Sequence, residues 1–410
     1  MPKETYKWQW VEKEIHSIIK NYGYGEIRTP VFEKTSLFIR SVGKETDVVS
    51  KEMYSWVDQG NDHLTLKPEL TAPVVRSYVQ HHLGRIQPIN RLYYIDALFR
   101  RERPQKGRQR QFHQFGVEAL GSEHPEMDVE VISIAYNIYK SLGVEKIKVR
   151  INSIGSADVR PRYVKELRKQ LSPYLDKMCK TCNDRIITNA LRVFDCKNRS
   201  CQSLYENYAP LISEYISQED QNHFNDVLKL LEDLKIPYVL DYKLVRGLDY
   251  YTRTTFEITS DMLGSQNALC GGGRYDKLVE QLGGDHTPAV GFAAGMERLL
   301  IVLENSLKNI KLSVDVYMVI LGETAISRSF LIAQEIRTKL KMIVITESSK
   351  RSMKAQMKEA NRQNASFVII VGDNEIKKGV VSIKDLKKGH QIEVNIPSII
   401  EYFEKIKKTK

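Results

Sequence analysis

The sequence predicts an α+β protein: an antiparallel sheet assembled from distant stretches of chain, a helical block inserted between them, and a separate α/β domain at the end. Two observations lead to this fold class. Strand-like runs fill much of residues 26–121 and return at 242–272, on either side of a polar stretch that is rich in helical periodicity. The final hundred residues instead alternate as β-α-β-α-β, which is typical of a small α/β domain.

Composition places the chain among ordinary globular proteins. Of its 410 residues, 42% are hydrophobic and 28% are charged, which excludes a disordered, collagen-like or coiled-coil chain. No apolar run approaches the roughly 20 residues that cross a bilayer, and the first residues lack the basic-then-apolar layout of a signal peptide. Five cysteines are few and odd in number, which suits a reducing compartment. We therefore expect no membrane contact and a cytoplasmic location.

The first part of the chain begins with a helix and continues mainly as strands. Thr5 is predicted to cap a helix whose apolar residues recur at helical spacing from Val11 onward, and Gly23 ends it. A second amphipathic helix is predicted over 70–82. Strands are predicted at 26–32, 53–57, 64–66, 92–99 and 115–120, and Pro30 restricts how the first of these can pair.

The middle of the chain is predicted to change from helix back to strand. Residues 125–142 form one predicted helix, and the polar stretch 156–234 holds several more. Strand character returns at 242–258 and at 269–272, before a helix that starts near Ala294.

The last hundred residues differ from the rest in pattern and in charge. Strands are predicted at 314–321, 342–346 and 367–371, with helices after the first strand up to about 341 and at 353–362. Residues 311–410 contain 19 Lys and Arg against 11 Asp and Glu, an excess of eight positive charges in a chain of net charge +11. Two explanations of this excess are about equally good. The segment is either a module that binds a polyanion or a domain with a solvated, Lys-rich surface.

A loop with six cations connects two apolar strands within residues 99–114. The cations are Arg100, Arg101, Arg103, Lys106, Arg108 and Arg110. Arginine binds phosphate bidentately through its planar guanidinium. Such a loop between neighbouring strands favours a pocket for a polyanionic ligand over the alternative, an exposed basic hairpin.

Residues 244–251 place charged and aromatic side chains inside an apolar run that we interpret as a strand. The run contains Arg246, Asp249, Tyr250 and Tyr251. A charge buried in such a run requires a partner or a ligand. A ligand contact and a structural Arg–Asp pair are both compatible with this pattern.

Two small-residue stretches follow. Three successive glycines at 271–273 allow the backbone to approach a ligand or another strand, but they match neither the dinucleotide nor the P-loop pattern. Residues 288–295 are predicted as a strand that enters a helix carrying Arg298, a side chain that either reaches a phosphate or is solvated.

Together these stretches resemble the class II aminoacyl-tRNA synthetases, and among them the histidyl-tRNA synthetase family. Phe99-Arg100-Arg101-Glu102 is similar to motif 2, and residues 291–298 are similar to motif 3. Residues 246–251 and 272–276 resemble the two signatures peculiar to histidyl-tRNA synthetase. Residues 27–49 resemble motif 1, which forms the dimer in that family. The resemblance covers essentially the whole chain, in the right order.

The resemblance implies an organisation and a reaction. It implies a catalytic domain in two parts, 1–155 and 235–310, a helical insertion at 156–234, and an anticodon-binding domain at 311–410. The implied activity is ATP-dependent ligation of L-histidine to tRNA(His) through histidyl-adenylate, with Mg²⁺ as cofactor, by a homodimer.

The resemblance also assigns a role to each candidate site residue. Histidine is expected to contact Glu69, Thr71 and Gln114 through its amino and carboxylate groups, and Glu118, Tyr250 and Tyr251 through its imidazole. ATP is expected to contact Arg100, Glu102, Arg108, Phe112 and Arg298. Arg246 and Arg100 are expected to be catalytic and also to contact histidine. The resemblance places Arg246 between the histidine carboxylate and the α-phosphate, and Arg100 on the α-phosphate. Arg103 and Gln105 are candidates for contact with the acceptor end of tRNA.

The chemistry of adenylate formation independently favours such a site. A carboxylate attacks a phosphorus atom, so two anions must approach each other, and catalysis depends on positioning and on cations. Arg100, Arg246 and Arg298 supply these cations without any nucleophilic side chain. Selection of histidine requires a buried acceptor for an imidazole N–H, which Glu118 can provide.

Four of the cysteines follow the pattern C-x2-C-x13-C-x4-C, at Cys179, Cys182, Cys196 and Cys201. The first pair has the spacing of zinc ligands, but the second pair is spaced more widely than in the common zinc ribbons. On spacing alone we disfavour a metal site and expect four free thiols in a helical segment.

Three rival functions share parts of this pattern. A non-catalytic histidine-sensing paralogue, such as the regulatory subunit of ATP phosphoribosyltransferase, would lack the ATP-binding arginines and the basic terminal domain that this chain contains. A tRNA-binding module of a stress-sensing kinase would need a kinase domain. A glycyl- or prolyl-type synthetase would not carry the signature at 246–251.

Overall fold

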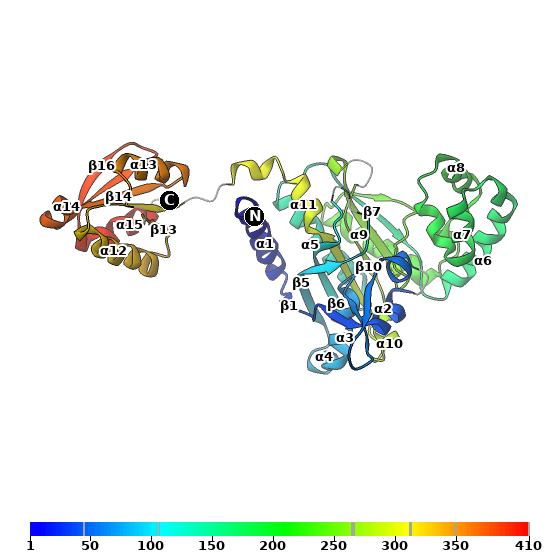
Figure 1. Cartoon of the computed structure of the whole chain (residues 1–410). Helices are drawn as coiled ribbons and strands as arrows, with labels where there is room; N and C mark the ends of the chain where they lie inside the picture. Colours follow the sequence, from blue (N-terminus) through cyan, green and yellow to red (C-terminus); the bar gives the residue numbers. More distant parts are fainter. Residues whose placement is uncertain are drawn as a thin grey trace. The chain divides into compact units, whose positions relative to one another are not determined.

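The computed structural model describes residues 1–43, 46–103, 105, 107–263, 267–310, 314–347 and 350–408 (Figure 1). Contacts divide the chain into two compact units, Lys7–Leu307 and Lys308–Lys410 together with Met1–Tyr6. The domain boundary expected at residue 311 lies outside the described residues.

The larger unit is built on an eight-stranded sheet in the order β1-β5-β6-β11-β10-β9-β7-β8. The central pairings are antiparallel, while β1 pairs with β5 and β8 with β7 in parallel. The predicted antiparallel sheet assembled from distant stretches is confirmed. Its strands are β1 (Gly25–Glu26), β5 (Asn90–Phe99), β6 (Gln111–Leu120), β7 (Ile147–Ser153), β8 (Tyr238–Leu240), β9 (Thr252–Ser260), β10 (Ala268–Arg274) and β11 (Ala289–Gly295).

Helices cover one face of this sheet. Helix α5 (Pro125–Ser141) packs against it, with α9 (Gln218–Asp233) beside α5. The ring of Phe115 on β6 lies 6.4 Å from that of Tyr139 on α5. Since successive side chains of a strand point to opposite faces, Gln114 on β6 points to the other face.

The first helix starts earlier than the sequence indicated. Helix α1 spans Pro2–Asn21, so Thr5 lies inside it and does not cap it. Proline is favoured in the first turn of a helix because its missing N–H has no partner there. Along α1, His16 lies 2.9 Å from the hydroxyl of Tyr93 on β5, which joins the helix to the sheet.

A small three-stranded sheet, in the order β2-β4-β3, lies between α1 and β5 in the chain. The single strand predicted at 26–32 is in fact two strands, β1 and β2, because Pro30 lies between them and cannot donate to a ladder. The elements here are β2 (Phe32–Lys34), α2 (Thr35–Val42), the π-helical turn Val48–Glu52, β3 (Tyr54–Val57), β4 (His63–Leu66), α3 (Thr71–Gln80) and α4 (Leu83–Ile86).

The polar middle stretch forms a helical block with its own core. Tyr163, Leu167, Cys182, Val193 and Cys201 are among its buried residues. Its elements before α9 are α6 (Val159–Leu171), the 3₁₀ turn Ser172–Lys177, α7 (Lys180–Thr188), the 3₁₀ turn Ala190–Asp195, α8 (Arg199–Tyr208) and the 3₁₀ turn Ile212–Glu214.

The strand predicted over 242–258 is wrong in its first half. Strand β9 begins only at Thr252, and residues 241–251 form an irregular loop. The polar groups of this loop are satisfied outside any ladder: the Asp249 N–H donates to the Val42 carbonyl (3.2 Å), and the Asp249 carbonyl accepts from Arg160 (2.7 Å). The two short elements α10 (Leu278–Gln281) and α11 (Met296–Val302) follow β10 and β11.

The smaller unit contains a five-stranded sheet in the order β13-β12-β14-β15-β16. Its first three strands are parallel and the last two antiparallel. The predicted β-α-β-α-β alternation is present, but the sequence analysis missed the elements after β14. The elements are β12 (Val316–Leu321), α12 (Thr324–Leu340), β13 (Val344–Thr346), α13 (Met353–Arg362), β14 (Phe367–Gly372), α14 (Asp373–Lys378), β15 (Val380–Asp385), β16 (Gln391–Asn395) and α15 (Ile399–Lys408).

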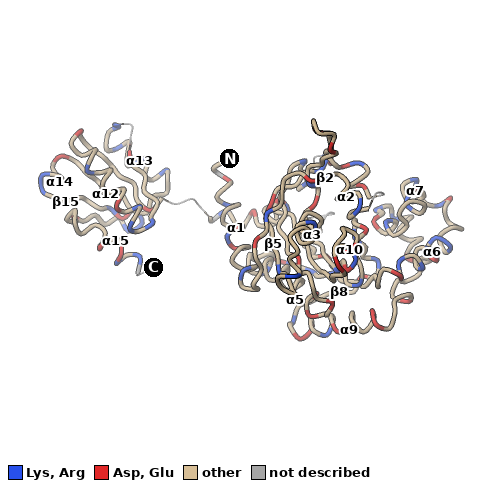
Figure 2. Tube along the Cα trace, turned by 90° about the horizontal axis from the view of Figure 1, so that it is seen from below, with Lys and Arg blue, Asp and Glu red and all other residues tan. Residues whose placement is uncertain are grey.

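The excess positive charge of this unit lies on its surface. Lys377 and Lys378 on α14, and Lys387 and Lys388 between β15 and β16, are exposed, and basic residues are spread over its helices and turns (Figure 2). Among the described helices of the whole chain, none is both long and apolar enough to cross a membrane.

Candidate active site

A cavity of about 430 Å³ opens over the face of the large sheet that α5 does not cover. Its walls come from the loop 241–251, the strands β6, β10 and β11, and the start of α11. Eleven of the residues predicted from sequence line it: Glu69, Thr71, Arg100, Glu102, Arg108, Phe112, Gln114, Arg246, Tyr250, Tyr251 and Arg298. Residues that are far apart in sequence therefore meet in one site.

Glu118 lies behind the cavity wall and is fully buried. One carboxylate oxygen accepts from the hydroxyls of Thr71 (2.8 Å) and Tyr94 (3.1 Å), and the other accepts from the hydroxyl of Tyr275. Burial raises the pKa of Glu118 to about 8, although these hydroxyls favour the ionised form. A Cβ on Gly291 of β11 would overlap this carboxylate, so the glycine makes space for it.

Glu69 caps helix α3 beside Glu118. Its carboxylate accepts from the backbone N–H groups of Thr71 (2.8 Å) and Ala72 (2.9 Å), which satisfies two free donors of the first turn. Burial raises the pKa of Glu69 to about 7. Two carboxyls with raised pKa values thus lie at the same end of the site, a pattern common at functional sites.

Arg246 and Gln114 carry polar atoms that lack a partner. Arg246 donates to Glu257 (2.8 Å), and its guanidinium occupies the space that a Cβ on Gly271 would fill. The Nε of Arg246 and the Oε1 of Gln114 are buried and have no hydrogen-bond partner among the described residues. Buried polar groups are nearly always paired, so this donor and this acceptor indicate a ligand with complementary groups.

A group of arginines lines another part of the cavity. Arg100 donates to the Pro68 carbonyl (2.8 Å) and lies 5.3 Å from the ring centre of Phe112. Arg108 pairs with Glu102 (3.2 Å), and Arg298 donates to the Ala268 carbonyl (2.9 Å). Burial, together with the nearby Arg108 charge, lowers the pKa of Arg298. Crowded cations of this kind are stabilised by an anionic ligand.

Arg103 and Gln105 lie away from the cavity. Both are exposed on the hairpin between β5 and β6, where Gln105 and Arg108 exchange backbone hydrogen bonds (2.9 and 3.2 Å). Pro104 and Lys106 of the same hairpin lie outside the described residues. Among the described cations of this loop, Arg100 and Arg108 line the cavity, whereas Arg101, Arg103 and Arg110 are exposed.

Several contributors were missed by the sequence analysis. Tyr94, Tyr275 and Glu257 hold the predicted residues in place, and only Tyr275 stood inside a recognised signature. The helical block also reaches the site: Arg192 lines the cavity and pairs with Asp47 (2.6 Å). No pattern in the sequence pointed to Arg192.

Arg274, the arginine of the 272–276 signature, stabilises the fold and does not line the cavity. Arg274 is fully buried and pairs with Asp128 at the start of α5 and with Asp276 (3.2 Å). It also donates to the Ser122 carbonyl (2.7 Å). This cation therefore anchors α5 to β10, away from the cavity.

The four cysteines of the helical block, Cys179, Cys182, Cys196 and Cys201, lie together. All of their sulfur atoms lie within 4.8 Å of one another. The spacing that disfavoured a metal gave no sign of this proximity, because it arises from tertiary packing, including that of α7 against the 3₁₀ turn Ala190–Asp195.

Comparisons with known proteins agree with the geometry. Residues 1–299 match the family described as histidyl-tRNA synthetase, and residues 315–406 match a family described as an anticodon binding domain. The histidine–tRNA ligase of Natranaerobius thermophilus is 44% identical over 409 residues, covering 99% of this chain and 97% of the relative. That of a Geobacillus species is 45% identical over 408 residues, covering 98% and 96%.

A solved structure shows the same likeness. The apo histidyl-tRNA synthetase of S. aureus superposes with a TM-score of 0.82 at 35% identity, covering 98% of this chain and 97% of that one. Because the family match spans most of the chain and the relatives match it almost end to end, the chain belongs to the histidyl-tRNA synthetase family.

Proposed function

We propose that this chain is an ATP-dependent histidine–tRNA ligase that works in the cavity described above. A carboxylate oxygen of L-histidine attacks the α-phosphorus of ATP, forming histidyl-adenylate and releasing pyrophosphate. The 3′-terminal hydroxyl of tRNA(His) then attacks the histidyl carbonyl and releases AMP. The observation that best supports this proposal is the pair of unpartnered polar atoms in one cavity, on Arg246 and Gln114.

The end of the cavity with the buried carboxyls receives histidine. Glu69, Thr71 and Gln114 bind the amino and carboxylate groups, while Tyr250 and Tyr251 flank the imidazole. Glu118 accepts the imidazole N–H in its ionised form, which the three hydroxyls favour against the effect of burial. These hydroxyls occupy part of its capacity, since an ionised carboxylate offers about four acceptor sites. An analogue without the ring nitrogens would leave this buried group unpaired.

The arginine group receives ATP. Arg100 holds the α-phosphate, Glu102 and Phe112 receive the adenine, and Arg108 and Arg298 hold the outer phosphates. The lowered pKa of Arg298, which is due to burial and to the nearby Arg108 charge, supports this role because a bound polyanion would relieve the repulsion.

Arg246 is the catalytic arginine, acting together with Arg100. Its unpartnered Nε can donate to a non-bridging oxygen of the α-phosphate, where negative charge concentrates in the transition state. Glu257 on β9 orients the guanidinium from the other side (2.8 Å). The site needs no side-chain nucleophile or general base, because the substrate carboxylate is the nucleophile.

Magnesium fits the donor set of this cavity. Glu52 and Glu297 line it, and neither is assigned to histidine or to the adenine. Carboxylates beside a triphosphate are the hard oxygen ligands that Mg²⁺ prefers. When bound, the ion would neutralise charge on the leaving pyrophosphate.

The remaining contacts concern tRNA and assembly. Arg103 and Gln105, both exposed on the hairpin between β5 and β6, bind the acceptor end, and the basic terminal unit binds the anticodon. Homodimerisation is supported by exposed apolar side chains at the small sheet, Val31, Phe32, Trp56 and Val57. A cytoplasmic location is supported by the five cysteines, none of which forms a disulfide in the described part of the chain.

The decisive experiment is exchange of pyrophosphate into ATP, run separately with each of the twenty standard amino acids. Exchange with histidine alone is expected. Exchange with glycine or proline would contradict the histidine-binding roles. Binding of histidine without any exchange would instead identify a sensor that has lost the activation step.

A further inference from the structure

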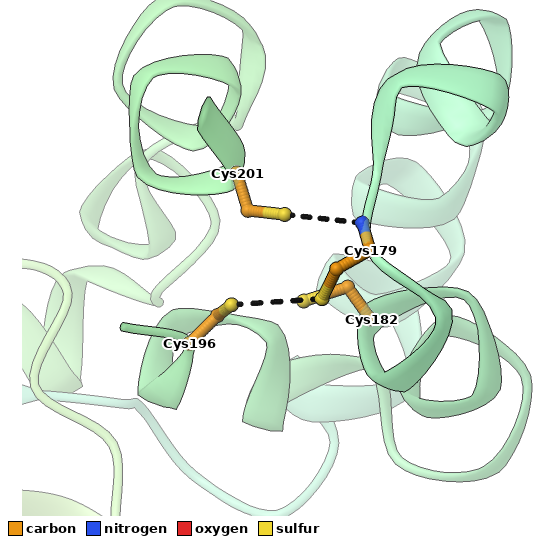
Figure 3. Close-up of side chains that lie close together, drawn as sticks. All are labelled: Cys179, Cys182, Cys196 and Cys201. Atoms are coloured by element: carbon orange, nitrogen blue, oxygen red, sulfur yellow. Dashed lines mark hydrogen bonds between the residues drawn. The ribbon is translucent and has the colours of Figure 1, made fainter. Parts of the chain in front are cut away.

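The four clustered cysteines have the geometry of a tetrahedral metal site (Figure 3). Four thiolates bound to Zn²⁺ at about 2.3 Å lie about 3.8 Å from one another in an ideal tetrahedron. Here the sulfurs of Cys179 and Cys196 are 3.9 Å apart, and all four lie within 4.8 Å of one another. A single ion therefore fits with only small side-chain movements, whereas a disulfide requires about 2.05 Å.

The surrounding backbone favours thiolates. The Cys179 N–H donates to the Cys201 sulfur (3.3 Å), and the Asn198 N–H donates to the Cys196 sulfur (3.4 Å). Cys179 is the N-cap of α7 and Cys201 lies in the first turn of α8. The positive ends of two helices thus face the cluster, which stabilises negative charge on the sulfurs.

The site is closed, as structural zinc sites are. Cys182, Cys196 and Cys201 are buried in the core of the helical block, and Cys179 is partly buried. Four protein sulfurs leave no open position for a substrate. The elements that they join are short, with nine residues in α7 and ten in α8, and helices of this length are marginal without further support.

The segment between the ligands supports the catalytic cavity. Asn189 donates to the Asp249 carboxylate (3.0 Å), in the loop that carries Arg246. Arg192 pairs with Asp47 (2.6 Å) in the cavity wall. Both residues lie between Cys182 and Cys196, so an ion held by these cysteines would fix both ends of the segment.

We propose that Cys179, Cys182, Cys196 and Cys201 bind one Zn²⁺, which holds the helical block in the shape that brings Asn189 and Arg192 to the cavity. This assignment replaces the expectation of four independent free thiols that the wide C-x4-C spacing suggested. It does not depend on the substrate assigned to the cavity, because the ion would be needed for the shape of the block alone.

Metal analysis of the full chain tests the proposal directly. The chain is purified without chelator and without a metal-affinity tag, and zinc is measured by mass spectrometry. About one zinc per chain is expected. Replacement by Co²⁺ should produce the intense near-ultraviolet thiolate-to-metal absorption and the visible bands of a tetrahedral tetrathiolate site.

Serine variants identify the ligands. Cys179→Ser and Cys201→Ser should each lose the stoichiometric zinc and the cobalt spectrum. Cys270→Ser is the matched control, because Cys270 is buried in β10 outside the cluster, and it should keep both. Hydrogen exchange measured by mass spectrometry should show faster exchange at 179–201 after the zinc is removed with a chelator, while exchange in β5 and β6 stays unchanged.

Several results would overturn the proposal. These are zinc well below stoichiometry in the native chain with no uptake after reduction, iron in place of zinc, or disulfides between these cysteines. Retention of zinc by both cluster variants would exclude these ligands. If a serine variant fails to fold, the metal content and cobalt spectrum of the unaltered chain still decide the matter.

Discussion

At the scale of single residues, Arg246 is the partly buried cation on which the proposed chemistry depends most. Arg246→Ala should lower the rate constant of adenylate formation by about 10²–10³, the usual loss for one preorganised donor. Histidine and ATP binding should weaken less, because the charge that Arg246 meets develops mainly in the transition state. Rapid-quench measurement of adenylate formation at saturating substrates gives this rate constant.

The control for Arg246 concerns its partner. The substitution leaves Glu257, which accepts from Arg246 at 2.8 Å, without its cation, so thermal unfolding must show an intact fold. Arg246→Ala combined with Glu257→Gln removes the unpaired charge and should not recover the rate. A near-normal rate constant with only a raised KM would assign Arg246 to substrate binding.

Glu118 links histidine recognition to pH. Its folded pKa of about 8 lies above the ordinary value of 4.5. The folded state therefore holds more protons than the unfolded state between these values, and stability should fall as pH rises through this window. Glu69, with a pKa of about 7, contributes in the same direction.

Glu118→Gln removes one of these two contributions. The Tm of the variant should fall less between about pH 6 and pH 9 than that of the unaltered chain, as measured by calorimetry. Its affinity for histidine should drop roughly 10- to 100-fold, the value of one hydrogen bond to a buried charge. Equal pH slopes, or unchanged histidine affinity in isothermal titration, would contradict the assignment.

At the scale of elements, the site depends on how strands and loops are placed. Beyond its first residue, loop 241–251 joins no strand ladder. Side chains of the helical block hold it: Arg160 donates to Asp249 twice, at 2.7 Å each, and Asn189 donates to it at 3.0 Å. The block is thus part of the support of the candidate site, although it lies outside the signature motifs in sequence.

Strand β10 contributes space to the site. A Cβ on Gly271 would overlap the guanidinium of Arg246, so Gly271→Ala should displace that arginine. The expected result is a loss of adenylation rate close to that of Arg246→Ala, about 10²-fold or more, measured by pyrophosphate exchange.

Gly25→Ala is the matched control for this substitution. A Cβ on Gly25 in β1 would meet only the Arg91 carbonyl at an ordinary 3.9 Å, and Gly25 is exposed. This variant should keep its exchange rate. Full activity of a folded Gly271→Ala variant would show that Arg246 can act without the space that Gly271 leaves for its guanidinium.

At the scale of the whole molecule, the two units divide the proposed work. The eleven predicted residues that line the cavity lie between Glu69 and Arg298, all within the unit Lys7–Leu307. A chain shortened to end near residue 311 should therefore still exchange pyrophosphate with histidine. It should charge tRNA poorly, because it lacks the basic unit proposed to bind the anticodon.

The controls for the shortened chain are its fold and its assembly. Circular dichroism should show that the shortened chain is folded. Sedimentation should show that it assembles as the full chain does. Binding of tRNA should weaken with salt less steeply for the shortened chain, because fewer counterions are released. If a folded shortened chain charged tRNA as efficiently as the full chain, the terminal unit would not be the anticodon reader.

The sequence by itself predicted the elements whose signals are local. The strands β5 and β6, the helix α5, and the entry of β11 into α11 follow from uninterrupted apolar periodicity, which is a property of neighbouring residues. The candidate residues came from short signatures, whose residue types and spacing carry chemistry without any coordinates. Resemblance to a family supplied their roles.

Only the tertiary structure decided how distant parts of the chain cooperate. Residues 244–251 have the composition of a strand, yet contacts from Arg160 and Asn189 hold them as a loop, and no local pattern encodes those contacts. Arg192 and the cysteine cluster are likewise products of packing between helices. Apolar periodicity predicts which face of a single helix or strand is buried. The partners of a buried charge or thiol depend instead on which elements the fold brings together.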